Sequence, residues 1–105
     1  MKTTNIYQNI PPKSAEEFFE TLFQNPTIKI ERIVSRGHAS PKEGWYDQEK
    51  DEWVIVLEGE AVLSFEMRED VRLQKGDYYY IPARLKHKVS WTTPHQETIW
   101  LACFF

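Results

Sequence analysis

The stretch from Gly76 to His87 (GDYYYIPARLKH) contains the residues whose types and spacing say most about possible chemistry. A Gly-Asp turn precedes a tyrosine-rich run that ends at Pro82, and His87 follows at the start of another alternating apolar segment. An imidazole can bind a metal ion, or take up and release a proton near neutral pH. The other histidines, His38 and His95, lie in expected loops and are interpreted as solvent-exposed. His87 is therefore the first candidate site residue.

Several other kinds of chemistry have no matching pattern in the sequence. There is no nucleophile-histidine-acid order, no phosphate-binding loop and no zinc-ribbon spacing. Arg84 and Lys86 flank the proline turn and could hold an anionic substrate group, although a solvated turn is the favoured interpretation. Cys103, on a terminal apolar segment, is interpreted as a small buried hydrophobic residue.

Length and composition set the broad class of the protein. A chain of 105 residues has room for one domain with one core. The net charge of −3 argues against nucleic acid as a partner, because phosphate binding needs a basic face. A single cysteine cannot form an internal disulfide and fits a reducing compartment. With no apolar run of membrane-spanning length and no evident secretory signal, we expect a cytoplasmic protein that does not bind membranes.

Residues 14–24 are predicted to form the one helix of the chain. Ser14 is a candidate N-cap, Glu17 completes a capping box, and Asn25-Pro26 is a stop signal. The apolar side chains form one stripe at helical spacing, and a lid over a sheet is favoured over a partner or membrane face. The stripe consists of Ala15, Phe18, Phe19, Leu22 and Phe23.

The remainder of the chain has the features of a β protein. Short segments rich in β-branched and aromatic residues alternate with turns that contain Gly or Pro, a pattern typical of a β-sandwich or small barrel. Residues 1–12 are predicted to be an extended arm, either free or paired with a sheet edge of this chain or of a partner subunit. The expected strands are 27–35, 52–57, 61–67, 71–74, 78–81, 87–91 and 98–104.

Two motifs in this β-rich region resemble those of the cupin superfamily. Glu52, followed after six residues by Gly59, is similar to the second half of the first cupin motif. The spacing of glycine, proline and histidine within Gly76–His87 is similar to the second motif, and the resemblance covers residues 33–104. It implies a double-stranded β-helix, or jelly-roll barrel, usually assembled as a dimer.

The expected fold is therefore mainly β, a cupin-type jelly-roll barrel with one N-terminal α-helix. We expect a single cupin domain over 1–105, made of the arm (1–12), the helix (14–24) and the barrel (27–105). A homodimer is expected, with the arm and the aromatic outer strands as candidates for its interface.

The resemblance also implies a metal site with fewer histidines than usual. Cupins normally bind a divalent metal through three histidines and a glutamate, two of the histidines forming an H-x-H pair shortly before the glutamate. Before Glu52, that pair would fall on Tyr46 and Gln48 or, one residue earlier, on Trp45 and Asp47. Neither pair contains a histidine.

The candidate metal ligands are therefore Asp47, Gln48, Glu52 and His87. Such an oxygen-rich set suits Zn, Fe(II), Mn or Ni and leaves open positions for a substrate. The alternative is a buried, hydrogen-bonded pair of Glu52 and His87 with no metal, since pairing satisfies the same requirement of burial.

Aromatic side chains near these ligands are candidates for a ligand pocket. Tyr46 lies beside the expected site, and strand alternation places Trp91 on one face with His87 and Val89. In the second motif, Trp91 stands where cupins normally have asparagine, and Arg84 where they have glycine. Most other aromatic residues are interpreted as core, sheet-face packing or dimer interface.

Two functions remain open at this point. One is a small metal-dependent cupin enzyme, such as an oxygenase, isomerase or lyase of a small polar or aromatic metabolite. The other is a metal-free or weakly metal-binding cupin that binds or senses a small molecule without catalysis.

Overall fold

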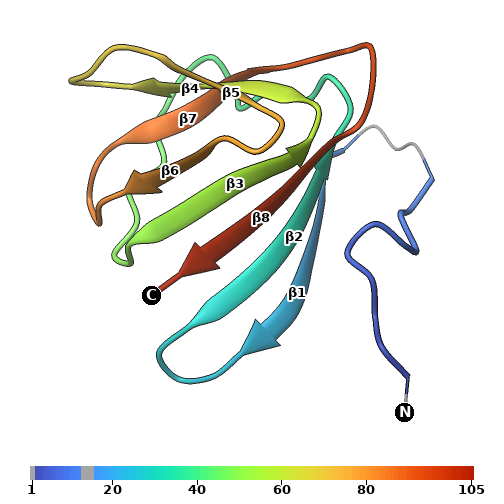
Figure 1. Ribbon diagram of the computed structural model, residues 1–105. Coiled ribbons are helices and arrows are strands. Elements are labelled where there is room, and N and C mark those ends of the chain that lie inside the picture. The colour runs from blue at the N-terminus through green and yellow to red at the C-terminus, as the bar shows by residue number, and fades with distance from the viewer. Residues whose placement is uncertain (1, 13–15) are drawn as a thin grey trace.

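The computed structural model describes residues 2–12 and 16–105, in which eight strands form two antiparallel sheets (Figure 1). The larger sheet has the order β1-β2-β8-β3-β6 and the smaller one β5-β4-β7. The strands are β1 (Phe18–Gln24), β2 (Lys29–Ser35), β3 (Glu52–Glu58), β4 (Glu60–Phe65), β5 (Val71–Gln74), β6 (Tyr78–Ile81), β7 (His87–Thr92) and β8 (Thr98–Phe104).

The core lies between the two sheets, and strand alternation decides which side chains enter it. In β3 and β4, every second residue is buried, as the pattern of a sheet with one face on the core requires. The buried cluster consists of Val54, Val56, Ala61, Leu63, Phe65, Leu73, Ile81, Trp100 and Ala102. Burial of these side chains is the main stabilising contribution, at about 25 cal/mol for each Å² of apolar surface removed from water.

The prediction of a helix at 14–24 is wrong over the residues that the structure describes. Phe18–Gln24 form β1, which pairs antiparallel with β2, while Ser14 and Ala15 lie outside the described residues. Within 2–12 and 16–105 there is no helix of the length and hydropathy needed to cross a membrane. Every regular element in residues 2–12 and 16–105 is a strand, so the described part of the chain is all-β.

The Asn25-Pro26 pair, interpreted above as a helix stop, makes the turn of a β-hairpin. The side-chain oxygen of Asn25 accepts hydrogen bonds from the backbone N–H groups of Thr27 (2.9 Å) and Ile28 (2.8 Å). A side chain of this kind closes a turn by mimicking a backbone carbonyl. The turn lays β1 against the edge of β2, and a register shift after Thr21 permits apolar residues at helix-like spacing.

The N-terminal arm contacts its own chain through Arg32 of β2. The guanidinium of Arg32 donates to the backbone carbonyls of Ile6 (3.1 Å), Gln8 (2.7 Å) and Asn9 (3.2 Å), and it forms an ion pair with Glu20. Figure 1 shows this arm running on the side of β1, the edge strand of the larger sheet. In this structure the described part of the arm is thus docked on its own chain rather than free.

The two motif glycines both need a left-handed backbone, but only one is enclosed. Gly59, between β3 and β4, has φ +91°, and a Cβ there would lie 2.6 Å from the carbonyl oxygen of Glu97. Gly76, between β5 and β6, has φ +88°, and a Cβ there would meet nothing within 4 Å. Gly59 is therefore required both for its conformation and for its lack of a side chain.

Replacing these two glycines separates the two requirements. Gly76→Ala should lower the free energy of unfolding by about 1 kcal/mol, the cost of a left-handed L-residue. Gly59→Ala should lower it by about 3 kcal/mol, because the clash with the neighbouring backbone adds to that cost. Urea unfolding of both variants measures the difference, and equal destabilisation would contradict the close approach at Gly59.

Candidate functional site

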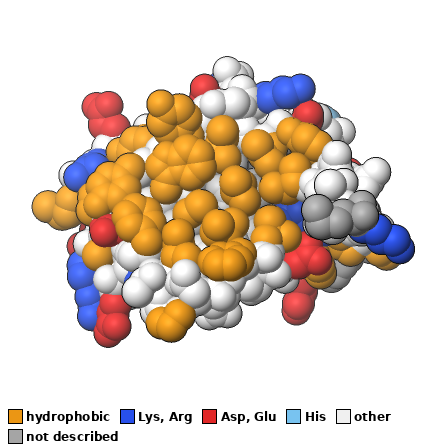
Figure 2. Space-filling model, turned by 60° about the horizontal axis from the view of Figure 1, so that its bottom comes forward, with side chains coloured by type: hydrophobic (Ala, Val, Ile, Leu, Met, Phe, Trp, Pro, Cys, Tyr) orange, Lys and Arg blue, Asp and Glu red, His pale blue; other side chains and the backbone are white. Residues whose placement is uncertain are grey.

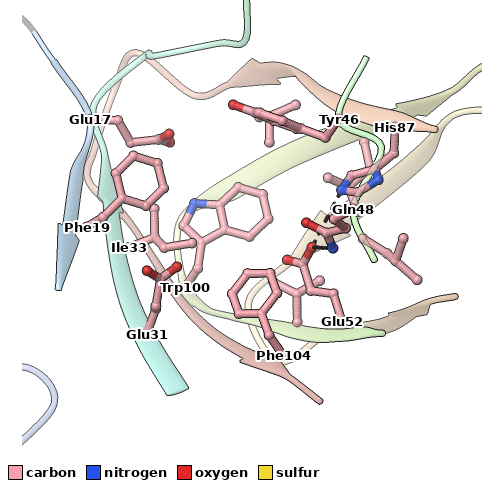
Figure 3. A pocket seen from close by; sticks show the side chains of 14 residues that line it. Glu17, Phe19, Glu31, Ile33, Tyr46, Gln48, Glu52, His87, Trp100 and Phe104 are labelled. Atoms are coloured by element: carbon pink, nitrogen blue, oxygen red, sulfur yellow. Dashed lines mark hydrogen bonds and ion pairs between the residues drawn. The ribbon is translucent and has the colours of Figure 1, made fainter. Parts of the chain in front are cut away.

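A cavity of about 210 Å³ lies between the sheets, on the concave face of the larger one. Most of its walls are apolar side chains, which come from strands of both sheets. A concave, mostly apolar space with a few convergent polar groups is the usual form of a small-molecule site. The polar side chains that line it are Glu17, Glu31, Tyr46, Gln48, Glu52 and His87 (Figure 3).

Three of the predicted metal ligands meet on one side of this cavity. The Nε2 atom of His87 lies 3.5 Å from Oε1 of Glu52, and the same oxygen accepts a 2.9 Å hydrogen bond from the side-chain amide of Gln48. Both Glu52 and His87 are buried. The spacing of the two motifs therefore predicted the pair of residues that the fold brings together.

The structure also decides which residues stand at the positions of the usual H-x-H pair. Tyr46 and Gln48 point into the cavity. Trp45 does not line it, and the ammonium of Lys88 lies 4.7 Å from the centre of the Trp45 ring. Asp47 does not line the cavity, and its carboxylate forms an ion pair with Arg84 at 3.3 Å. Of the two oxygen donors proposed from the sequence, the geometry brings Gln48 to the site and leaves Asp47 outside it.

Backbone contacts hold the loop before β3 against the start of β7. Tyr46 and His87 form an isolated antiparallel bridge, with N–H···O distances of 2.8 and 3.1 Å in the two directions. The Arg84 N–H donates to the carbonyl of Gln48 at 2.9 Å. Arg84 has φ +67°, so it adopts, at the position where cupins usually have glycine, the conformation that favours glycine.

The second ring nitrogen of His87 determines what the first can do. Nδ1 lies 2.9 Å from the carbonyl oxygen of Leu85, a contact in which the ring must donate. Nε2 therefore faces Glu52 either as a lone pair or as the second N–H of the imidazolium. Burial alone would lower the pKa of His87, but the hydrogen bond and charge of Glu52, together with the Leu85 carbonyl, outweigh it and raise that pKa.

Trp91 lies outside the cavity, contrary to the alternation expected from the sequence. Its side chain is 39% exposed and does not line the cavity. In the pairing of β4 with β7, Val62 faces Trp91 but Leu63 faces Val89, so Ser90 is an additional residue in β7. This β-bulge turns Trp91 outward and places Thr92 on the buried side.

Among the cavity-lining residues that the sequence did not point to are Glu17, Glu31 and Trp100. Glu17 was assigned to a helix cap, but its carboxylate accepts a hydrogen bond from the hydroxyl of Ser35. Glu31 could have been found from alternation, since it lies on the same side of β2 as Ile33 and Ser35. Alternation gives only the side of β2 on which Glu31 lies; that this side faces a cavity follows from the pairing of β1 with β2.

The raised pKa of His87 predicts a pH-dependent contribution to stability in the metal-free protein. A group with a raised pKa in the folded state stabilises most below its unfolded pKa, and that contribution is lost as the pH rises through the folded value. The difference in unfolding free energy between wild type and His87→Gln should thus be larger at about pH 5.5 than at about pH 8.5. Urea unfolding in EDTA tests this, and the opposite order would show that burial dominates.

In Glu52→Gln, an NMR titration should find the pKa of His87 lower than in wild type, because the charge and hydrogen bond of Glu52 raise it.

Comparisons with known proteins agree with this architecture. The cupin domain profile matches residues 33–104. A proposed mannose-6-phosphate isomerase from Ralstonia eutropha JMP134 is 37% identical, with a TM-score of 0.93, and the match covers 99% of this chain and 97% of that one. No curated protein matches the sequence.

More distant structures share the fold alone. An RmlC-like cupin protein from Desulfovibrio desulfuricans is 19% identical with a TM-score of 0.76, and the match covers 99% of this chain and 95% of that one. An RmlC-like cupin with a double-stranded β-helix fold from Methanocaldococcus jannaschii is 18% identical with a TM-score of 0.70, covering 90% and 84% of the two chains. The all-β double-stranded β-helix, two motif spacings and a profile match over most of its length together place this chain in the cupin domain family.

Proposed function

We propose that this cupin binds a divalent metal ion through Gln48, Glu52 and His87 and a small molecule in the rest of the cavity. The observation that carries the proposal is the convergence of these three side chains on one side of the cavity. The Leu85 carbonyl holds the imidazole by Nδ1, so that Nε2 is directed at Glu52. A histidine held by one nitrogen and presenting the other is the usual arrangement of a metal ligand.

The donor set fits an open site of modest affinity. It offers one imidazole nitrogen, one carboxylate and one amide, which suits Zn, Fe(II), Mn or Ni with positions left for a substrate or water. Two acceptors facing each other, a neutral imidazole nitrogen and a carboxylate oxygen, also need a cation or a proton between them. When bound, the metal would supply a Lewis acid to polarise an oxygen of the ligand.

An isomerase is the reaction class that we favour among those left open by the sequence. The support is the relative from Ralstonia eutropha, which is 37% identical over 99% of this chain and is itself proposed to isomerise mannose 6-phosphate. Tyr46, whose ring centre lies 5.8 Å from that of His87, lines the same cavity and could orient a substrate beside the metal ligands.

The second candidate function is binding or sensing of a small molecule without metal. One observation favours it: Gln48, Glu52 and His87 already contact one another, which satisfies buried polar groups without an ion. Within the described residues, no group of three or more His, Cys, Asp or Glu side chains is placed to hold a metal. Metal content distinguishes the two functions.

We also propose that the protein forms a homodimer through the outer face of the larger sheet. Because Val54 points inward, Trp53 and Ile55 of β3 point outward, where Tyr80, Tyr78 and Leu101 pair with them. Figure 2 shows hydrophobic side chains gathered in one broad area on this face. A large exposed apolar area commonly marks an interaction surface, and a second copy would cover it.

We retain the proposal of a cytoplasmic location without nucleic-acid or membrane partners. The support is the single free cysteine, Cys103, and the net charge of −3.

Metal content after supplementation tests the metal proposal. Wild type incubated with Mn, Fe(II), Ni or Zn and then desalted should retain about one ion per chain, since a site fills when the free metal exceeds its dissociation constant. His87→Gln and Glu52→Gln should lose most of that metal, whereas Asp47→Asn, which changes a carboxylate outside the cavity, should keep it. Retention below about one tenth of an ion per chain would reject the metal site in favour of the metal-free function.

Light scattering tests the dimer. Wild type at micromolar concentration should have twice the 12.5 kDa mass of one chain. Tyr78→Glu should shift it toward the monomer by placing a charge in the interface, and Met67→Glu is the control, because Met67 lies beyond the end of β4 in the smaller sheet and is 82% exposed. A monomeric wild type, or equal effects of the two variants, would contradict the proposed surface.

A further inference from the structure

The cavity has a second region, separated from Glu52 and His87 by the indole of Trp100 (Figure 3). Figure 3 shows Glu17 and Glu31 on one side of this ring, with Phe19 between them, and the candidate metal ligands on the other side. Trp100 is only 3% exposed, so its ring is a fixed wall. This second region therefore combines aromatic surfaces with carboxylates.

The charges of the cavity walls are all of one sign, apart from His87 when it is protonated. Three carboxylates line the cavity, and among the described residues no Lys or Arg does. The carboxylate of Glu31 is balanced by Lys29, whose ammonium lies 3.1 Å away outside the cavity. No such balance is present for Glu17 among its described contacts.

Glu17 is held in place as an acceptor. Its carboxylate accepts a hydrogen bond from the hydroxyl of Ser35, and Trp100 Nε1 donates to that same hydroxyl at 3.2 Å. Both partners are buried, and they tie the carboxylate to the indole that divides the cavity. The result is a fixed anion at the N–H edge of the indole, in a cavity that aromatic side chains also line, and such an anion attracts an organic cation.

We propose that the cavity takes a small organic amine, with its ammonium at Glu17 and its apolar or aromatic body against Trp100 and Phe19. This deepens the proposed function by naming the ligand class, and it rests on the small-molecule cavity but not on a bound metal. The carboxylate attracts a positive charge, most strongly where water is excluded, and the aromatic side chains offer apolar surface to the body of the amine. In protein without bound metal, the same carboxylates repel a phosphate, so the amine differs in charge from the mannose 6-phosphate of the Ralstonia relative's proposed reaction.

Binding of three matched probes tests the proposal. Phenethylamine, 2-phenylethanol and phenylacetate share an aromatic body and are respectively positive, neutral and negative at neutral pH. Calorimetry or ligand-observed NMR with the full chain should show the amine binding at least about tenfold more tightly than the carboxylate. That ratio corresponds to a difference of about 1.4 kcal/mol in binding free energy. Mannose 6-phosphate should bind no more tightly than mannose.

Variants at the two glutamates identify the responsible charge. Glu17→Gln keeps an acceptor for Ser35 and should reduce the affinity of the amine to that of the alcohol, leaving the alcohol unchanged. Glu31→Gln is the matched control and should have a smaller effect, because Lys29 already balances that carboxylate. Equal binding of the three probes, tighter binding of an anion, or no binding of any probe at millimolar concentration would overturn the proposal on wild type alone.

Metal content measured on the same samples separates this inference from the metal function. A charge preference in protein that holds no metal would reject only the metal site. Protein that retains metal but shows no preference for the amine would reject only the ligand class.

Discussion

The antiparallel bridge between Tyr46 and His87 is the contact on which the candidate site depends. It joins the loop before β3 to the first residue of β7 and thereby extends the smaller sheet by one backbone pair. Because neighbouring residues of an extended segment point to opposite sides, the bridge sends residues 46 and 48 into the cavity and 45 and 47 away from it. The Arg84 N–H, which donates to the carbonyl of Gln48, then fixes this segment at a second point. The chemistry of the site therefore begins with two backbone hydrogen bonds.

Most of the barrel could be predicted from the sequence, because turn residues and alternation are local signals. The expected bounds of β5, β6 and β8 agree with the structure, and the other predicted strands differ by two residues or fewer at each end. The segment Phe18–Gln24 could not be assigned in this way. Its apolar spacing suits a helix, but the edge of β2 and the turn at Asn25 provide a better partner than isolated helical hydrogen bonds. Pairing with the neighbouring strand of a hairpin outweighed a helical preference within the segment.

The candidate site was predictable only as far as motif spacing reaches. Glu52 and His87 follow from two spacings, and the structure brings them together. Whether Gln48 or Asp47 enters the cavity depends on which residue of this loop pairs with His87, and no sequence signal marks that residue. Glu17 requires knowledge that β1 is a strand. These failures have one physical origin: each depends on pairing with another segment, the start of β7 for the loop before β3 and β2 for the segment after Glu17.

The additional residue in β7 has a consequence for how such a cavity changes in evolution. If β7 paired with β4 without the bulge, Ser90 would stand opposite Val62, and the indole of Trp91 would take the inward place that Thr92 now has. A much larger side chain would then face the space between the sheets. A change in strand pairing, with no substitution at any lining residue, could thus alter the room available to a ligand. Insertions and deletions in this strand would therefore be expected to alter ligand size among related barrels more abruptly than point substitutions.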